Sequence, residues 1–231
     1  FSEYKSAIKP AVKPSNKAVV EDSSVEGLTQ ALELDLTLNS PLDFDAPLPE
    51  HALLNTAVGN LVHHVLELMV HEGIEHWTLA TLKTRTPVYK QWLEQQGLRG
   101  ECLESGLTRV VQSLSHALEN PRVCWALNNA HQASQTEYAL SAFESTTQSI
   151  SHHIVDRTYI DEHGVRWIID YKTSVFDGDK PATERFIDNK VALYRAQLAR
   201  YGALFKELDG QDRSQKWVLY FSYLDRWIEV V

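Results

Sequence analysis

Hydrophobic residues follow two different spacings along the chain, and the spacing changes near residue 135. Between about 52 and 130 they recur every three or four residues, which is typical of helices that bury one face. We predict helices over about 88–96, 103–119 and 122–132, separated by breaks at Pro87, Gly97–Gly100 and Pro121. An earlier stripe predicts one more helix and consists of Val58, Leu61, Val62, Val65, Leu68 and Met69.

After residue 135 the pattern becomes that of strands. Three consecutive stretches are rich in β-branched and aromatic residues: TEYALSAFEST, SISHHIVDRTYI and VRWIIDYKTS. A helix is predicted over about 184–208, and KWVLYFSYLDRWIEVV predicts two short strands with a turn near Asp225. The apolar stripe of this helix consists of Tyr194, Leu198, Tyr201, Phe205 and Leu208. The order of elements predicts an α/β or α+β domain with a mixed sheet.

The first 50 residues lack regular periodicity. They contain the basic, Pro-containing stretch KPAVKPSNK and the acidic stretch PLDFDAPLPE. We interpret residues 1–50 as a linker or as a segment that wraps over the body. Residues 51–231 then form the folded domain, with a helical part at about 51–132 and a sheet core at about 135–231. Because the chain begins with Phe1, we also expect it to be a fragment of a longer protein.

Composition narrows the class of protein. The chain has 231 residues, of which 43% are hydrophobic and 23% charged, as in soluble globular proteins. No run approaches the ~18 apolar residues of a membrane span, so we expect no membrane partner. The two cysteines, Cys102 and Cys124, form no CxxC pair, which argues against a disulfide framework or a zinc site and favours reduced thiols in a cytoplasmic protein.

The formal net charge of −9 argues against a general nucleic-acid binder, because phosphate contacts need Lys and Arg. It does not exclude an enzyme that gathers carboxylates around a metal ion. A domain that receives DNA from a neighbouring domain also needs less positive surface of its own.

Candidate chemistry lies around a predicted hairpin. Asp161–Gly164 separates two strand-like runs, and Gly164 suits the left-handed position of a short hairpin loop. If Asp161 pairs with Val165, Asp156 lies opposite Asp170. Strand alternation then places Asp170 and Lys172 on one face, roughly 7 Å apart, and the apolar neighbours on the other. Those neighbours are Trp167, Ile169 and Tyr171.

Two facing carboxylates repel each other unless a cation lies between them. Hard oxygen ligands of this kind suit Mg²⁺ or Mn²⁺. The alternative is a solvated face on which Lys172 forms an ion pair with one Asp. Because Asp170 and Lys172 are embedded in the apolar strand IIDYKT, where burial of charge is costly, we favour the functional interpretation.

Three motifs resemble those of the RecB-like nucleases in the PD-(D/E)XK superfamily. VDR at 155–157 and IIDYKTS at 168–174 resemble the core signature. Gly59-x-x-x-His63-x-x-Leu66-Glu67 resembles the N-terminal helix motif, and Gln197-x-x-x-Tyr201 resembles the C-terminal motif. The motifs occur in the family's order over about 59–201. The ending YFSYLDRWIEVV resembles the closing strands of nuclease domains appended to superfamily 1 helicases.

The resemblance implies a restriction-endonuclease-like α/β core, in which helices flank a mixed central sheet. It also implies that Lys172 is the catalytic lysine and that Mg²⁺ or Mn²⁺ is the cofactor. Two cysteines are too few for the four-cysteine iron–sulfur cluster of some relatives. The implied metal ligands are His63, Asp156, Asp170 and the carbonyl of Tyr171.

Further residues have supporting roles or simpler explanations. Gln197 would hold the lysine or a DNA phosphate, whereas packing explains Tyr201 as well as function does. Glu67 lies one helical turn from His63 and can reach the same site. Glu137 matches an acidic position of the family and opens the first strand, where a solvated charge is the alternative.

His152 and His153 stand where the family often has glycine. They either contact DNA or metal or are half-exposed strand residues.

The function implied is metal-dependent hydrolysis of phosphodiester bonds in DNA by an exonuclease of recombination and repair. The implied partners are a DNA single strand or duplex end, a helicase domain in the same full-length chain, and a second subunit. The alternative is a catalytically idle module that binds DNA ends or supports a helicase complex.

Overall fold

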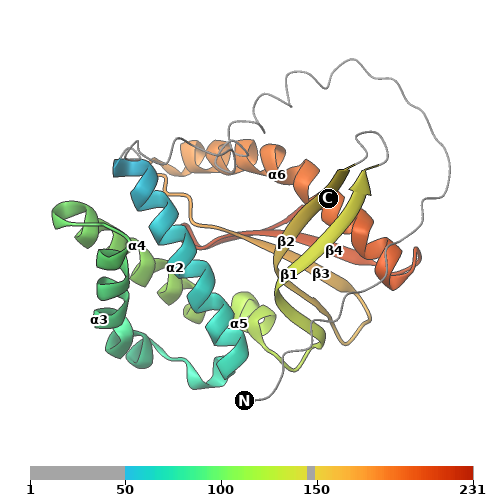
Figure 1. The fold of residues 1–231 in the computed structure, drawn as a ribbon, viewed down its shortest axis with the longest axis horizontal. Helices are drawn as coiled ribbons and strands as arrows, with labels where there is room; N and C mark the ends of the chain where they lie inside the picture. The colour runs from blue at the N-terminus through green and yellow to red at the C-terminus, as the bar shows by residue number, and fades with distance from the viewer. Residues whose placement is uncertain (1–49, 145–148, 231) are drawn as a thin grey trace.

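The computed structural model describes residues 50–144 and 149–230 (Figure 1). The predicted linker at 1–50 therefore lies outside the described residues, apart from Glu50, which begins the first described helix. No helix in the described ranges is long and apolar enough to cross a membrane.

In the described part of the chain, four α-helices precede the sheet, in agreement with the predicted helical region. They are α2 (Glu50–Glu72), α3 (Leu79–Gln95), α4 (Gly100–Glu119) and α5 (Pro121–Leu127), with the short 3-10 helix η2 (Ile74–His76) after α2. The apolar stripe of α2 is buried, except that Leu68 is partly buried. The predicted breaks at Gly97–Gly100 and Pro121 are confirmed.

Two predicted helix boundaries are wrong. Helix α3 begins at Leu79 and runs through Pro87, although a proline inside a helix loses one backbone hydrogen bond. Buried side chains on both sides of Pro87, Leu82 and Tyr89 among them, hold the two halves of α3 in the core. Helix α5 ends at Leu127 instead of near residue 132, because Gln132 already pairs with the second strand.

The five strands of residues 50–144 and 149–230 form one mixed sheet, as predicted. They are β1 (Gln132–Glu144), β2 (Ser149–Ile160), β3 (Arg166–Lys172), β4 (Gln215–Phe221) and β5 (Arg226–Val230), and they lie side by side in chain order. Only β3 and β4 are parallel among these neighbours. Helix α6 (Lys180–Asp209) connects them, since parallel strands need a crossover.

Helices cover both faces of the sheet. Helix α6 lies on one face and α2–α5 lie on the other (Figure 1). Trp167, Ile169 and Tyr171 belong to the core shared with α2–α5, whereas Ile168 packs with residues of α6. The predicted stripe of α6 is buried except at Leu208, which is 46% exposed near the end of the helix. The inclusion of Leu208 in the stripe was wrong.

The hairpin between β2 and β3 has the predicted register. The Asp161 N–H donates to the Val165 carbonyl over 3.0 Å, and Gly164 takes the left-handed φ of 78°. Pairing continues to Arg157 opposite Ile169. One step further along the same register brings Asp156 opposite Asp170.

Candidate active site

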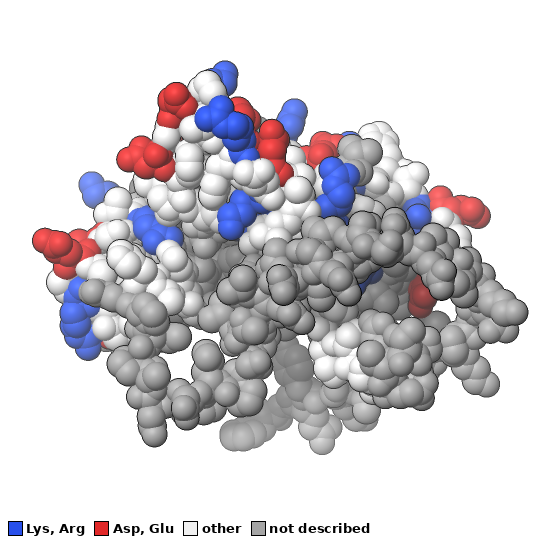
Figure 2. Space-filling model, turned by 90° about the horizontal axis from the view of Figure 1, so that it is seen from above, with Lys and Arg blue, Asp and Glu red and all other residues white. Residues whose placement is uncertain are grey.

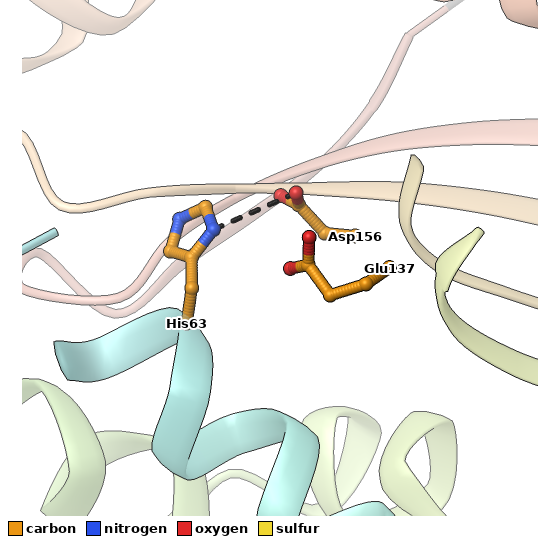
Figure 3. A group of neighbouring side chains, drawn as sticks. All are labelled: His63, Glu137 and Asp156. Atoms are coloured by element: carbon orange, nitrogen blue, oxygen red, sulfur yellow. Dashed lines mark ion pairs between the residues drawn. The ribbon is translucent and has the colours of Figure 1, made fainter. Parts of the chain in front are cut away.

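Three potential metal ligands from three elements converge where α2 crosses the sheet (Figure 3). His63 comes from α2, Glu137 from β1 and Asp156 from β2. His63 Nδ1 lies 3.5 Å from Asp156 Oδ1. One ligand atom from each residue lies within 4.8 Å of the other two. We call His63, Glu137 and Asp156 the metal-ligand group.

Glu137 lies inside β1 and not at its start, so its predicted position was wrong. Its neighbours pair with β2 as Thr136 with Arg157 and Tyr138 with Val155, which places Glu137 opposite Asp156. Its φ of 45° is left-handed, a conformation that costs energy for a residue with a side chain. Strained residues of this kind cluster at functional sites. The local irregularity accompanies the approach of Glu137 to Asp156.

The second carboxylate predicted from the hairpin lies next to this group. The Tyr171 N–H donates to Asp156 Oδ2 over 2.6 Å, so the backbone of β3 fixes the Asp156 side chain. Asp170 lies on the other side of the same peptide and is 4% exposed. The hairpin register thus holds the two carboxylates near each other. The predicted role of the Tyr171 carbonyl stays a prediction.

Asp170 and Lys172 form a buried ion pair on the α6 face of β3. The ammonium lies 2.7 Å from Asp170 Oδ2 and 3.8 Å from the ring centroid of Tyr194. The Oδ2 atom accepts no well-directed hydrogen bond within the described part of the chain, so the short contact is an ion pair by distance. A buried carboxylate oxygen that accepts no hydrogen bond can bind an additional cation.

Gln197 contacts the carboxylate and not the lysine. Its Nε2 donates to the Tyr201 hydroxyl over 2.6 Å and reaches Asp170 Oδ1 at 3.5 Å. Of the two expected roles of Gln197, the structure shows a contact with the carboxylate that pairs with Lys172, and a contact with a DNA phosphate stays a prediction. Tyr201 is buried and its hydroxyl accepts a hydrogen bond from the Gln197 amide. The four-residue spacing thus lets Tyr201 pack in the core and at the same time position the side chain of Gln197.

The charges in the site are strongly coupled. Burial raises the pKa of Asp170, and the charge of Asp156 raises it further against the effect of Lys172. Burial also acts on Asp156, but His63 and the Tyr171 N–H outweigh it and lower the pKa of Asp156. Burial lowers the pKa of Lys172, but Asp170, Tyr194 and Asp156 together outweigh it and raise that pKa. Burial also lowers the pKa of His63, and the carboxylates of Asp156 and Asp170 together raise it. The site therefore stabilises positive charge.

The donor set fits a divalent cation. One imidazole nitrogen and two carboxylate oxygens lie within 4.8 Å of one another, close enough to surround an ion with ligand bonds of about 2.0–2.6 Å. Imidazole and carboxylate together suit Mn²⁺ and related ions, and carboxylates suit Mg²⁺. Asp170 can join this set if its side chain turns from Lys172.

Glu67 lies beside the metal-ligand group. One oxygen is 3.5 Å from His64 Nδ1 and the other is 3.5 Å from His71 Nε2. These histidines are exposed and lie on the same helix. The Glu67 charge contributes to a raised pKa of Glu137, after burial and the charge of Asp156.

The two histidines before Asp156 do not join the metal-ligand group. His152 Nδ1 lies 3.0 Å from Ser141 Oγ on the neighbouring strand. The ring of His153 packs edge-on against Tyr201, with centroids 5.9 Å apart. A contact of either ring with DNA stays a prediction.

Sequence reasoning missed Arg157, which is fully buried behind the site. Its Nη1 donates to Ser134 Oγ over 2.7 Å and to the Gln135 carbonyl over 3.2 Å. Its Nε and Nη2 donate to the carbonyls of Ala126 and Asn128, each over 2.9 Å. The sequence did contain an indication of this role, since Arg157 directly follows Asp156 in an apolar strand. An arginine buried in such a strand needs hydrogen-bond acceptors from other elements.

The comparisons with known proteins agree with this fold. A family model described as "PD-(D/E)XK nuclease superfamily" matches residues 34–226, which is more than half of the chain. No curated protein matches the sequence. The matched range includes every residue of the metal-ligand group together with Asp170, Lys172 and Gln197. The chain belongs to the PD-(D/E)XK nuclease superfamily.

Proposed function

We propose that this protein is a divalent-metal-dependent deoxyribonuclease that hydrolyses phosphodiester bonds. The observation that carries the proposal is the convergence of His63, Glu137 and Asp156 beside the Asp170–Lys172 ion pair. Membership in a superfamily of nucleases that use divalent metals supports the same conclusion.

In the proposed site, His63, Asp156 and Asp170 hold the metal, and Glu137 supports or completes the set. A bound divalent cation supplies a Lewis acid that lowers the pKa of water and offsets the charge of the scissile phosphate.

Lys172 carries a positive charge in a buried place, where it stabilises negative charge that develops on the phosphate. Tyr194 and Asp170 hold its ammonium. Gln197 restrains Asp170 from the opposite oxygen.

We further propose that the enzyme acts as an exonuclease in recombination and repair, on DNA delivered by a helicase domain of the same full-length chain. The resemblance of the three motifs and of the closing strands supports this context. The charge distribution agrees with it, since Lys and Arg are interspersed with Asp and Glu on the face in Figure 2. A net charge of −9 does not favour tight independent DNA binding.

The test is incubation of linear and covalently closed DNA with the protein and Mg²⁺ or Mn²⁺. Degradation of linear DNA alone supports an end-dependent exonuclease, and nicking of closed DNA supports an endonuclease. No cleavage with either metal, by protein that binds DNA ends, would favour the catalytically idle module.

A further inference from the structure

A polar cavity lies next to the metal-ligand group. Its volume is about 290 Å³, and it is bounded by the second half of α2, the connection from α5 and the first part of β1. Its lining consists of Glu67, Val70, His71, Asn129, Ser134, Gln135 and Thr136. We call it the α2–β1 cavity.

The cavity adjoins the metal-ligand group along two elements, although none of the three ligand residues lines it. On α2, Glu67 lies one turn beyond His63. On β1, Thr136 directly precedes Glu137. A phosphate at the metal-ligand group would therefore have this cavity beside it, within reach of an attached nucleoside.

The chemistry of the lining suits a neutral, hydrogen-bonding ligand. Among the described residues no Lys or Arg lines the cavity, and Glu67 repels anions, so a second phosphate is disfavoured. The side-chain amides of Asn129 and Gln135 make no hydrogen bond within the described ranges, and both residues are exposed. Amides pair with adenine, and a carboxylate accepts a hydrogen bond from the amino group of cytosine. The amides of Asn129 and Gln135 and the carboxylate of Glu67 therefore match the hydrogen-bond donors and acceptors along the edge of a nucleobase.

The size also fits a single base. A volume of about 290 Å³ is at the lower end of the range for small-molecule sites, roughly 300 Å³ and upward. Val70 contributes an apolar wall, and the imidazole of His71 offers a flat surface.

The walls of the cavity are held in place from behind. Arg157 fixes Ser134 and the Gln135 backbone, as described above. Two other lining residues join β1 to α2, because Thr136 Oγ1 lies 3.1 Å from His71 Nε2. Because the backbone of this wall and the side chains of Ser134 and Thr136 are already held, this part of the site orders little on binding, which favours recognition.

We propose that the α2–β1 cavity binds the base of the nucleotide next to the scissile phosphate and favours adenine or cytosine over thymine, because the amino group of adenine or cytosine can donate to the amide and carboxylate oxygens of the lining. This inference rests on the proposed nuclease function for the position of the phosphate. The enzyme would then cleave preferentially beside adenine or cytosine and disfavour thymine. Gln135 and Asn129 are the specificity-determining residues.

The test compares binding of short oligothymidine strands with strands that carry one central dA or dC. Fluorescence anisotropy is measured with Mn²⁺ in a Lys172→Ala background, so that turnover does not consume the DNA. The amino-bearing strands should bind at least about fivefold more tightly. Gln135→Ala and Asn129→Ala should together remove this preference. Gln132→Ala, an exposed glutamine of the same strand outside the cavity, should keep it.

Cleavage-site mapping of mixed-sequence DNA by the otherwise unchanged protein provides the second readout. Products should be enriched for adenine or cytosine at one side of the cut, and the double variant should lose this enrichment while still cleaving. Equal binding of all strands, or a preference that survives Gln135→Ala with Asn129→Ala, would overturn the proposal. Absence of cleavage would count against the nuclease function, and the binding comparison would still decide whether the cavity selects bases.

Discussion

Lys172 and Asp170 project from the same face of β3, with the ammonium 2.7 Å from a carboxylate oxygen. Both side chains are largely buried between the sheet and α6, at 18% and 5% exposure. Such a pair does little for stability unless both charges are satisfied. Here the carboxylate that holds the ammonium also lies opposite Asp156 in the hairpin register, next to the proposed metal site, which gives the pair a reason to be buried.

Replacement of this lysine should abolish most cleavage. Lys172→Ala removes the positive charge proposed to act on the transition state, and we expect turnover to fall by about 100-fold or more. Turnover is measured on linear DNA with Mn²⁺ at equal concentrations of folded protein. Lys216→Ala is the matched control, because Lys216 pairs with Glu229 on the surface and should be dispensable. Turnover of Lys172→Ala equal to that of the control would refute the catalytic role.

Metal affinity should depend on the predicted ligands. A protein with both His63→Ala and Asp170→Asn should bind Mn²⁺ at least about tenfold more weakly in calorimetry, because it loses an imidazole and a charge. Glu137→Gln tests whether the third carboxylate belongs to the same site. Glu162→Gln, in the exposed hairpin loop, serves as the control. Equal affinity in the wild type and the double variant would count decisively against this site.

The hairpin that sets the register should depend on Asp161. Its Oδ1 accepts the N–H groups of His163 and Val165, and its Oδ2 accepts the Trp167 Nε1–H, at 2.8–2.9 Å. Asp161→Ala should lower the free energy of unfolding by about 1–3 kcal/mol, measured by urea denaturation at neutral pH. Asp161→Asn keeps an acceptor oxygen and should lose less.

The same carboxylate predicts an acid dependence. Burial alone would raise the pKa of Asp161, but the hydrogen bonds from Trp167, Val165 and His163 outweigh it and lower the pKa. Its contribution to stability is therefore present above the unfolded-state pKa of about 3.9 and is lost as the pH falls through the folded-state value. The difference between wild type and Asp161→Ala should shrink below pH ~4. A difference that stays constant there would show that Asp161 acts without its charge.

The protein alone should bind DNA weakly. The net charge is −9, and Lys and Arg are interspersed with Asp and Glu on the described part of the face in Figure 2, so we expect few phosphate contacts. We expect dissociation constants in the ~10⁻⁴–10⁻⁶ M range typical of non-specific binding, and a steep loss of affinity as salt rises. Anisotropy titrations at several salt concentrations measure both. Tight, salt-resistant binding would contradict the proposal that a partner domain delivers the DNA.

The sequence by itself determined the architecture and the central pair of the site. Period-four and period-two patterns specify helices and strands locally, so the order of elements was readable. Because the Asp161–Gly164 loop sets the register of the hairpin, Asp156 could be placed opposite Asp170. The order of elements and the hairpin register could both be predicted because each depends on residues that are close together in the sequence.

Only the tertiary structure decided which residues complete the site. Glu137 lies inside β1, has a left-handed backbone conformation and comes close to Asp156. Backbone strain of this kind cannot be predicted from the spacing of hydrophobic residues in the sequence. The contact of Gln197 with Asp170 depends on how α6 crosses the sheet. Arg157 finds its acceptors in α5, in the segment that follows it and in β1. These relationships join residues that are distant in sequence, and the packing of helices on the sheet fixes them.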